Sequence, residues 1–213
     1  MEAFEPTSDP QEAFNNLKVM AKEHGKPCLH VANRLLNTPE FKKWSASSRK
    51  DKHHYGTGQL AIHTNEVAIL CKSVGELYAG RHPDSIDLQE LFLAALFHDS
   101  GKICDHKHSH IYYKQTDPNS AIDEWTGTDH RRLIHHVSRS AIMWHDAAQS
   151  HPELFETYHD KVLHAILAHH GRREWGSPVA PKTRTAWILH YCDALSARIY
   201  DADTSDIVHA VNP

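Results

Sequence analysis

The sequence predicts an all-α fold, and three observations favour this class. Apolar residues recur at helical spacing along most of the chain, no segment keeps the two-residue alternation of a half-buried strand, and no linker or internal repeat divides the chain. A length of 213 residues suits one domain that buries its core without disulfides. We therefore expect a single compact helical bundle at residues 9–203, with its core at about 35–200, a flexible N-terminus at 1–8 and a C-terminal tail at 204–213.

Cap signals and apolar spacing locate the helices in order. Asp9-Pro10 and Thr38-Pro39 each combine a capping side chain with a proline at the first helical position, so they begin the first and third helices. Pro27 begins the second helix. Apolar periodicity predicts the later helices, which we expect at about residues 60–79, 84–97, 129–149, 153–170 and 183–200.

Two stretches lack this periodicity. Residues 105–128 are expected to form a long loop or irregular insert. Its first part, residues 105–110, alternates histidine with other polar residues, and we expect a solvated, flexible loop there rather than a second metal site. Residues 171–181 are rich in glycine and proline and are expected to form another loop.

Composition excludes several classes of protein. With 40% apolar and 23% charged residues, the chain is neither collagen-like, nor of low complexity, nor wholly disordered. No run of about 18 apolar residues could span a membrane, and the acidic N-terminus lacks the apolar segment of a secretory signal. Four widely spaced cysteines are typical of reduced thiols, so we expect a cytoplasmic protein. A net charge of −4 provides no overall attraction to nucleic acid.

The unusual feature of the composition is its 21 histidines. Imidazole is the commonest metal ligand and also serves in proton transfer near neutral pH. Most histidines in such a chain are ordinary surface or core residues, but six side chains stand out because each lies near the end of a helical segment beside a polar or glycine-bearing stretch. They are His63, His98, Asp99, His136, His169 or its neighbour His170, and Asp193. Imidazole and carboxylate together suit Mn, Fe, Zn or Ni rather than Ca.

The adjacent pair His98-Asp99 is distinguished by its setting. The apolar run at residues 91–97 leads into this pair, and a Ser100-Gly101-Lys102 turn follows it. A charge buried at the end of a core helix would be costly without a metal. At a two-metal centre the histidine can hold one ion while the carboxylate bridges both.

Four segments carry a resemblance to a known family. Residues 94–102 read AALFHDSGK, and residues 53–64, 168–178 and 189–198 read HHYGTGQLAIHT, AHHGRREWGSP and LHYCDALSAR. Taken in their order along the chain, these segments resemble the HD-domain superfamily of metal-dependent phosphohydrolases, and within it the YhaM-type 3′–5′ exoribonucleases. The resemblance covers roughly residues 35–200 and implies that the helical bundle is an HD domain. Gln59, Ser100 and Ser196 depart from the pattern of that branch, and nothing before residue 50 matches its OB-fold.

The resemblance also implies metal ligands. Four residues take the positions of the core ligands, and two positions add a second ion, with His170 serving instead of His169 or alongside it. The core set is His63, His98, Asp99 and Asp193, and the second set is His136 and His169/His170. One or two divalent ions are expected, with Mn first and Fe, Ni, Co, Mg or Zn as alternatives. Asp99 would bridge the ions and orient the attacking hydroxide.

Further side chains near these motifs are candidates for catalysis or substrate binding. Lys102 would hold a substrate phosphate and offset negative charge, together with Arg172 and Arg173. His54 would protonate a leaving oxygen, and its neighbour His53 would bind substrate. The alternatives are an exposed lysine, exposed arginines and histidines that make structural hydrogen bonds. A tryptophan in the same motif, Trp175, either stacks on a base or packs onto the domain.

These observations predict a hydrolase that cleaves phosphoester bonds in a nucleotide or a short single-stranded nucleic acid. The resemblance implies a 3′–5′ exonuclease, whereas small size, acidity and the missing OB-fold favour a free (deoxy)nucleoside mono- or triphosphate as substrate. A di-iron oxygenase with the same ligands is a second alternative. A non-catalytic nucleotide-binding regulator is a third, disfavoured by the intact ligand set. No membrane partner is expected, and a homo-oligomer is left open.

Overall fold

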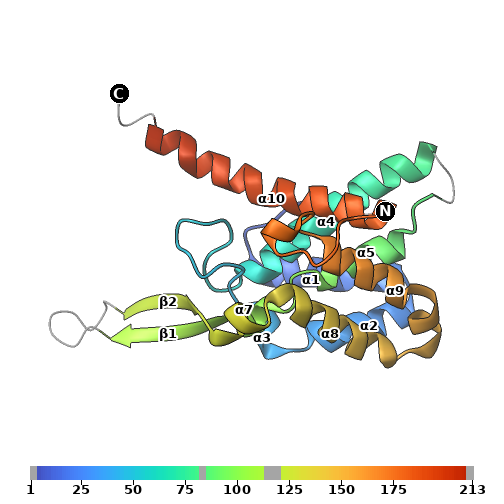
Figure 1. Ribbon diagram of the computed structural model, residues 1–213, viewed down its shortest axis with the longest axis horizontal. Coiled ribbons are helices and arrows are strands. Elements are labelled where there is room, and N and C mark those ends of the chain that lie inside the picture. The colour runs from blue at the N-terminus through green and yellow to red at the C-terminus, as the bar shows by residue number, and fades with distance from the viewer. Residues whose placement is uncertain (1–3, 82–84, 113–120, 210–213) are drawn as a thin grey trace.

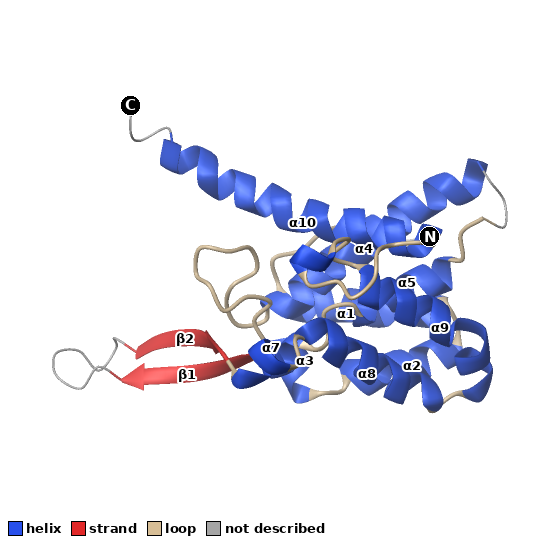
Figure 2. Cartoon of the chain, in the orientation of Figure 1, coloured by secondary structure: helices blue, strands red, loops and turns tan. Residues whose placement is uncertain are grey.

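The computed structural model describes residues 4–81, 85–112 and 121–209. It confirms the predicted all-α class, because the body of the molecule is a helical bundle and the strands form a two-stranded sheet at its side (Figure 2). The elements in order are α1 (Pro10–Glu23), α2 (Lys26–Leu36), α3 (Pro39–Lys43), α4 (Gln59–Arg81), α5 (Leu88–Phe97), α6 (Lys102–Asp105), β1 (His106–Tyr112), β2 (Ala121–Gly127), α7 (Asp129–Leu133), α8 (His136–Gln149), α9 (Pro152–Ala168), the 3-10 helix η1 (Arg173–Trp175) and α10 (Arg184–His209).

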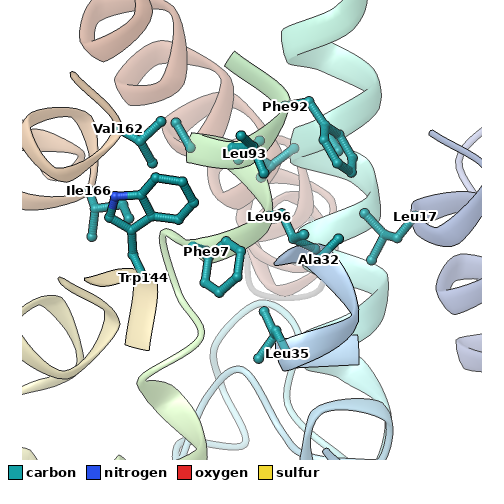
Figure 3. Close-up of a cluster of buried hydrophobic side chains, with 14 of the residues drawn as sticks. Leu17, Ala32, Leu35, Phe92, Leu93, Leu96, Phe97, Trp144, Val162 and Ile166 are labelled. Atoms are coloured by element: carbon teal, nitrogen blue, oxygen red, sulfur yellow. The ribbon is translucent and has the colours of Figure 1, made fainter. Parts of the chain in front are cut away.

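Helix α5 forms the centre of the core. Asp87 caps its start by accepting hydrogen bonds from the backbone N–H groups of Gln89 and Glu90, and all its residues from Glu90 to Phe97 are buried. Figure 3 shows apolar side chains of α5 between those of α1 and α2 on one side and those of α8 and α9 on the other. Each fully buried large apolar side chain contributes about 1.5–3 kcal/mol relative to leaving it exposed. This packing fixes the end of α5, where the His-Asp pair lies.

The expectation of a loop over residues 105–128 is wrong for the residues that the structure describes. Strands β1 and β2 pair antiparallel, with His106 opposite Gly127 and His108 opposite Trp125, and they project from the helical body in Figure 1. Trp125 is buried, and its ring lies 4.7 Å from that of His108 and 5.0 Å from that of Trp44. Histidine thus acts as an aromatic packing partner here, which a count of apolar residues does not detect. Residues 113–120 of the expected loop lie outside the described part.

The start of this hairpin is also buried rather than solvated. Asp105 and His106 are 1% and 5% exposed. The indole N–H of Trp44 donates to the carbonyl oxygen of His106 over 3.0 Å, and the backbone N–H of Trp125 donates to the Tyr55 hydroxyl over 3.1 Å. These bonds join the hairpin to the loop between α3 and α4. The predicted flexible loop at residues 105–110 is therefore corrected to the end of α6 and the docked beginning of β1.

Two helix boundaries differ from the expected ones. The helix predicted at residues 129–149 is divided into α7 and α8, because His135 has a positive φ of 69° between them. The last helix, α10, extends to His209, beyond the expected start of a tail at residue 204. The sequence between residues 201 and 209 holds neither glycine nor proline, so nothing there breaks a helix. Among the described helices, none combines the length and hydropathy that a membrane span requires.

Candidate metal centre

Several helices bring the predicted metal ligands to one buried point. Two groups of predicted ligands form there, and in each group one ligand atom from every member lies within 4.8 Å of the others. Asp105 and His135 form a third such group with His136. The first group comes from α4, the end of α5 and α10, and the second from the start of α8 and the end of α9. The members are His63, His98, Asp99 and Asp193 in the first group, and His136, His169 and His170 in the second.

Asp99 lies between the two groups. Its Oδ2 atom is 3.2 Å from Nε2 of His63 and 3.5 Å from Nε2 of His98. Its Oδ1 atom is 3.3 Å from Nε2 of His136 and 3.7 Å from Nε2 of His169. One carboxylate oxygen therefore faces each histidine group, which is the arrangement of a bridging ligand.

The five histidine rings have one feature in common, because a hydrogen bond holds the Nδ1 nitrogen of each. Three rings donate to backbone carbonyl oxygens over 2.6–2.7 Å, one donates to a hydroxyl over 3.3 Å and one to a carboxylate over 3.2 Å. The pairs are His98 with Ala95, His169 with Ile166, His170 with Trp175, His63 with Ser196, and His136 with Asp105. Acceptors of this kind fix the tautomer of a metal-binding histidine and leave Nε2 as the ligand atom.

The Nε2 lone pairs then point toward one another. The Nε2 atoms of His63 and His98 are 3.3 Å apart, and those of His136 and His170 are 3.2 Å apart. Within the described part of the chain, Oδ1 of Asp99 and Nε2 of His169 are buried and make no hydrogen bond, while Oδ2 of Asp99 forms an ion pair with Lys102. Buried polar atoms are rarely left in this state. Divalent cations between these atoms would satisfy them, so the residues fit one or two metal ions.

The protonation states also favour positive charge at this point. Burial alone would raise the pKa of Asp99, but Lys102 and His98 hold that pKa well below its ordinary value. Burial would lower the pKa of His98, but Asp99 and Asp193 raise it to about 10. Without a metal ion, the first group therefore holds a proton on His98, and a metal ion would displace that proton. Burial lowers the pKa of His136 to about 3, which leaves that ring neutral, as a metal ligand must be.

A glycine brings the two groups together. The backbone N–H of Gly101 donates to the Ser140 hydroxyl over 2.8 Å, so the turn after Asp99 lies against the start of α8. A Cβ atom at Gly101 would lie 2.4 Å from the carbonyl oxygen of His136. The close approach that places His136 beside Asp99 therefore requires glycine at this position.

The metal centre opens into a cavity of about 320 Å³. Ligands from both groups form part of its lining, and basic and aromatic side chains surround them. The lining residues are Asp99, His169, His170, Asp193, Lys52, His53, Lys102, Trp175, His190, Ala194, Ala197 and Arg198. The structure thus places the predicted residues Lys102 and His53 at the cavity, and Lys102 Nζ lies 2.5 Å from Oδ2 of Asp99.

His54 lies behind the metal centre instead. Its ring is 1% exposed, and its Nε2 donates to Oε2 of Glu66 over 3.0 Å. The same Glu66 oxygen accepts from the Ser196 hydroxyl, which in turn accepts from His63. Burial lowers the pKa of His54 to about 4, so the ring is neutral near pH 7. This geometry favours support of His63, and the predicted acid role of His54 stays a prediction.

The two predicted arginines lie at the rim, on or beside η1. Both are exposed, and neither belongs to the described lining of the cavity. The guanidinium of Arg172 lies over the indole of Trp175, 4.9 Å from the ring centroid. Arg172 thus contacts an aromatic residue of the cavity, while the predicted phosphate contacts of Arg172 and Arg173 stay predictions.

Sequence reasoning missed several residues that support the site. Glu66 and Asp105 are carboxylates that reach ligand histidines directly or through one hydroxyl, and Lys52, His190 and Arg198 line the cavity. The sequence indicates Ser196 only as a departure from the family pattern. The sequence does carry a signal for Arg198, because this residue ends the fourth motif, at residues 189–198.

Comparison with known proteins identifies the class. The family model of the HD domain matches residues 60–198, a range that contains all seven residues of both groups. The chain therefore belongs to the HD-domain family, and the predicted resemblance to this family of metal-dependent phosphohydrolases is confirmed.

Two curated relatives carry the name 3′–5′ exoribonuclease YhaM. The chain is 34% identical to the protein from Bacillus licheniformis over 163 residues and 34% identical to the one from Shouchella clausii over 158 residues. These matches cover 75% and 73% of this chain, but only 44% and 42% of the relatives. The chain thus spans less than half the length of either relative. No solved structure matches it significantly.

Proposed function

We propose that this chain hydrolyses phosphoester bonds at the 3′ end of short single-stranded nucleic acids. The observation that carries the proposal is the position of Asp99 in the lining of the cavity, with one carboxylate oxygen facing each histidine group. A shared carboxylate of this kind holds two ions close enough to act on one phosphoryl group. Similarity to two proteins named exoribonucleases supports the choice of a nucleic-acid substrate.

The side chains of the cavity would have different roles in the reaction. Divalent cations on the ligands named above would polarise a phosphoryl oxygen and lower the pKa of a water molecule, and we propose Mn²⁺ first, with Fe, Ni, Co, Mg or Zn as alternatives. Lys102, at the cavity beside Asp99, would offset negative charge that develops on the phosphoryl group. The indole of Trp175 is 53% exposed at the cavity and would stack on a base.

A free nucleotide is the second candidate substrate. The cavity of about 320 Å³ has the size of a pocket for one small ligand, and the net charge of −4 does not attract long nucleic acids. A di-iron oxygenase would use the same histidines and carboxylates, so it is retained as a third candidate.

Product analysis by mass spectrometry would separate these candidates. The purified chain with Mn²⁺ is given short RNA and DNA oligomers, NTPs, dNTPs and mononucleotides. Stepwise shortening of oligomers to monophosphates is the expected result. Release of phosphate or triphosphate from free nucleotides, with the oligomers intact, would overturn the exonuclease proposal in favour of the second candidate. Oxygen uptake by an iron-loaded chain without any hydrolysis would favour the third.

Two aspartate variants provide a matched control for that experiment. Asp99→Ala removes the bridging carboxylate and is expected to abolish both turnover and metal binding. Asp146→Ala removes an exposed aspartate from another His-Asp dipeptide and is expected to leave both unchanged. An Asp99→Ala variant that kept its metal and its turnover would overturn the assignment of the site.

We also propose that the protein works in the cytoplasm. The support is that all four cysteines are free thiols, three of them buried, as is common in a reducing compartment. Cell fractionation tests this, since recovery outside the cytoplasmic fraction would contradict it.

A further inference from the structure

Asp105 is a buried carboxylate that contacts the second histidine group without lining the described cavity. Its Oδ1 atom accepts a hydrogen bond from Nδ1 of His130 over 2.7 Å. Its Oδ2 atom accepts one from the backbone N–H of His136 over 2.9 Å and another from Nδ1 of the same residue over 3.2 Å. Both oxygens are therefore used, and both of the bonds on Oδ2 hold the ligand His136.

Two residues outside the metal centre, Arg139 and His130, determine which atom donates and which accepts in these hydrogen bonds. The Nε–H of Arg139 donates to Nε2 of His130 over 3.1 Å, so that nitrogen is an acceptor. The proton of the neutral His130 ring then lies on Nδ1, where it faces Asp105. The chain of donors and acceptors runs from Arg139 through His130 to Asp105, and the carboxylate accepts from His136 as well. Only one tautomer of His136 agrees with this chain, the one with Nε2 free to bind a cation.

The two histidine groups differ in their negative charge. The first contains Asp193 and shares Asp99, whereas the second has three histidines and shares only Asp99. Asp105 is the carboxylate directly behind the second group, and it contacts His136 as outer carboxylates contact metal-bound histidines. By contrast, His169 and His170 are held by neutral backbone carbonyl oxygens.

We propose that Asp105 is a positioning residue for a second metal ion, with Arg139 and His130 fixing its orientation. The chain of three residues sets the tautomer and direction of His136 and supplies negative charge that the second group lacks. The inference rests on the proposed two-ion centre, but not on the identity of the substrate. It also gives a role to Arg139, a half-buried residue of α8.

Binding of Mn²⁺ to the full 213-residue chain tests this directly. Equilibrium dialysis with metal analysis, together with titration calorimetry, measures the number of ions and the Kd of each. Asp105→Asn is expected to weaken the second ion by about 10- to 100-fold, the usual effect of losing an outer carboxylate partner, and to leave the first ion within about twofold. The amide keeps the size of the side chain but presents an N–H₂ group to one of three donors, and it removes the charge.

Ser196→Ala is the matched control, because Ser196 holds His63 of the first group as Asp105 holds His136 of the second. It is expected to weaken the first ion and spare the second. Arg139→Met provides a second test should Asp105→Asn not fold, as judged by circular dichroism. This variant lacks the hydrogen bond that fixes the tautomer of His130. It is expected to lower the affinity for the second ion, by a smaller factor than Asp105→Asn does.

Each contrary result is distinct. Equal weakening of both ions in Asp105→Asn, or unchanged affinities, would overturn the proposal, as would an unchanged second ion in Arg139→Met if Asp105→Asn is unfolded. A wild-type chain that binds one ion would overturn it too, while leaving hydrolysis open to measurement. Conversely, two ions with the expected pattern and no hydrolysis of nucleic acids would support the inference and contradict the proposed function.

Discussion

Lys102 and Arg173 each follow a predicted metal ligand, but they have different surroundings. Lys102 lines the cavity, and its ammonium group lies 2.5 Å from Asp99. Arg173 is exposed on η1. We expect Lys102→Met to lower kcat/KM by about a hundredfold, the scale of losing one donor to a transition state.

Arg173→Gln is the comparison, and we expect it to lower kcat/KM by only about two- to tenfold, since the charge of an exposed arginine is largely screened. Initial rates on the substrate identified in the product panel provide the measurement. Equal losses in the two variants would show that burial beside Asp99 gives Lys102 no advantage over an exposed arginine.

Trp175 supports the site in two separable ways. Its backbone carbonyl holds His170 over 2.6 Å, and its indole lies at the cavity. Trp175→Ala keeps the carbonyl and removes only the ring. We expect KM to rise by roughly tenfold for an oligonucleotide, because stacking on one base is worth about 1–3 kcal/mol, with partial recovery in Trp175→Phe. An oligonucleotide with an abasic 3′ end is the control, and an equal rise in KM for both substrates would contradict base stacking.

The residues that meet at the candidate metal centre could be predicted because their residue types and the motifs around them are local features of the sequence. Most of them lie near helix ends, whereas Asp193 lies inside α10. His98-Asp99 follows an apolar helix, and His169-His170 precedes a glycine. Asp105 could not be predicted in this way. It acts through His130 and His136, which are 25 and 31 residues away, and its own segment resembles a polar loop. Residues that orient ligands lack such a signal, because their partners are set by the packing of whole helices.

Among the secondary-structure elements, the junction of α6 with α8 sets the distance between the two histidine groups. Gly101 has an ordinary φ of −67°, so alanine is allowed by the backbone and meets only the close approach of α8. We expect Gly101→Ala to reduce the free energy of unfolding by about 1–3 kcal/mol, the usual cost of overpacking. Denaturant unfolding measures this change.

Gly80 on α4 is the matched control, because a Cβ atom there would meet nothing within 4 Å. Alanine is the better helix former, so Gly80→Ala is expected to stabilise the chain by about 0.5–1 kcal/mol. A Gly101→Ala variant as stable as the wild type would show that the turn and α8 are not in close contact.

The helices and the hairpin differ in how far along the sequence the residues that stabilise them lie. The first helix begins where Asp9-Pro10 predicts it, and Asp9 accepts the capping hydrogen bond from the backbone N–H of Gln11 over 2.8 Å. The hairpin instead depends on Trp44 and Tyr55, which contact it from more than 60 residues away in sequence. Local spacing therefore predicts the helices and misses the strands.

For the molecule as a whole, buried neutral histidines link stability to pH. His54 and His106 lie outside the two ligand groups, and burial lowers the pKa of each to about 4 from 6.5. Between these values the unfolded chain binds protons that the folded chain does not. Their contribution to stability is therefore complete above pH 6.5 and is lost as the pH falls toward 4. For each of the two histidines, the free energy of unfolding falls by about 3 kcal/mol across this range, at about 1.4 kcal/mol per pH unit.

Chemical denaturation of the metal-free chain at a series of pH values checks this expectation. His98 does not oppose the trend, because its pKa of about 10 leaves it protonated in both states below pH 6.5. Glu66 and Asp105, whose pKa values are lowered by their histidine partners in spite of burial, add to the loss at the acid end of the range. His106→Gln removes one of these titrating rings and leaves the metal ligands in place. It is therefore expected to make the free energy of unfolding depend less steeply on pH, by the contribution of one proton. A free energy of unfolding that stayed constant from neutral pH to pH 4 would show that these rings are accessible to protons in the folded chain.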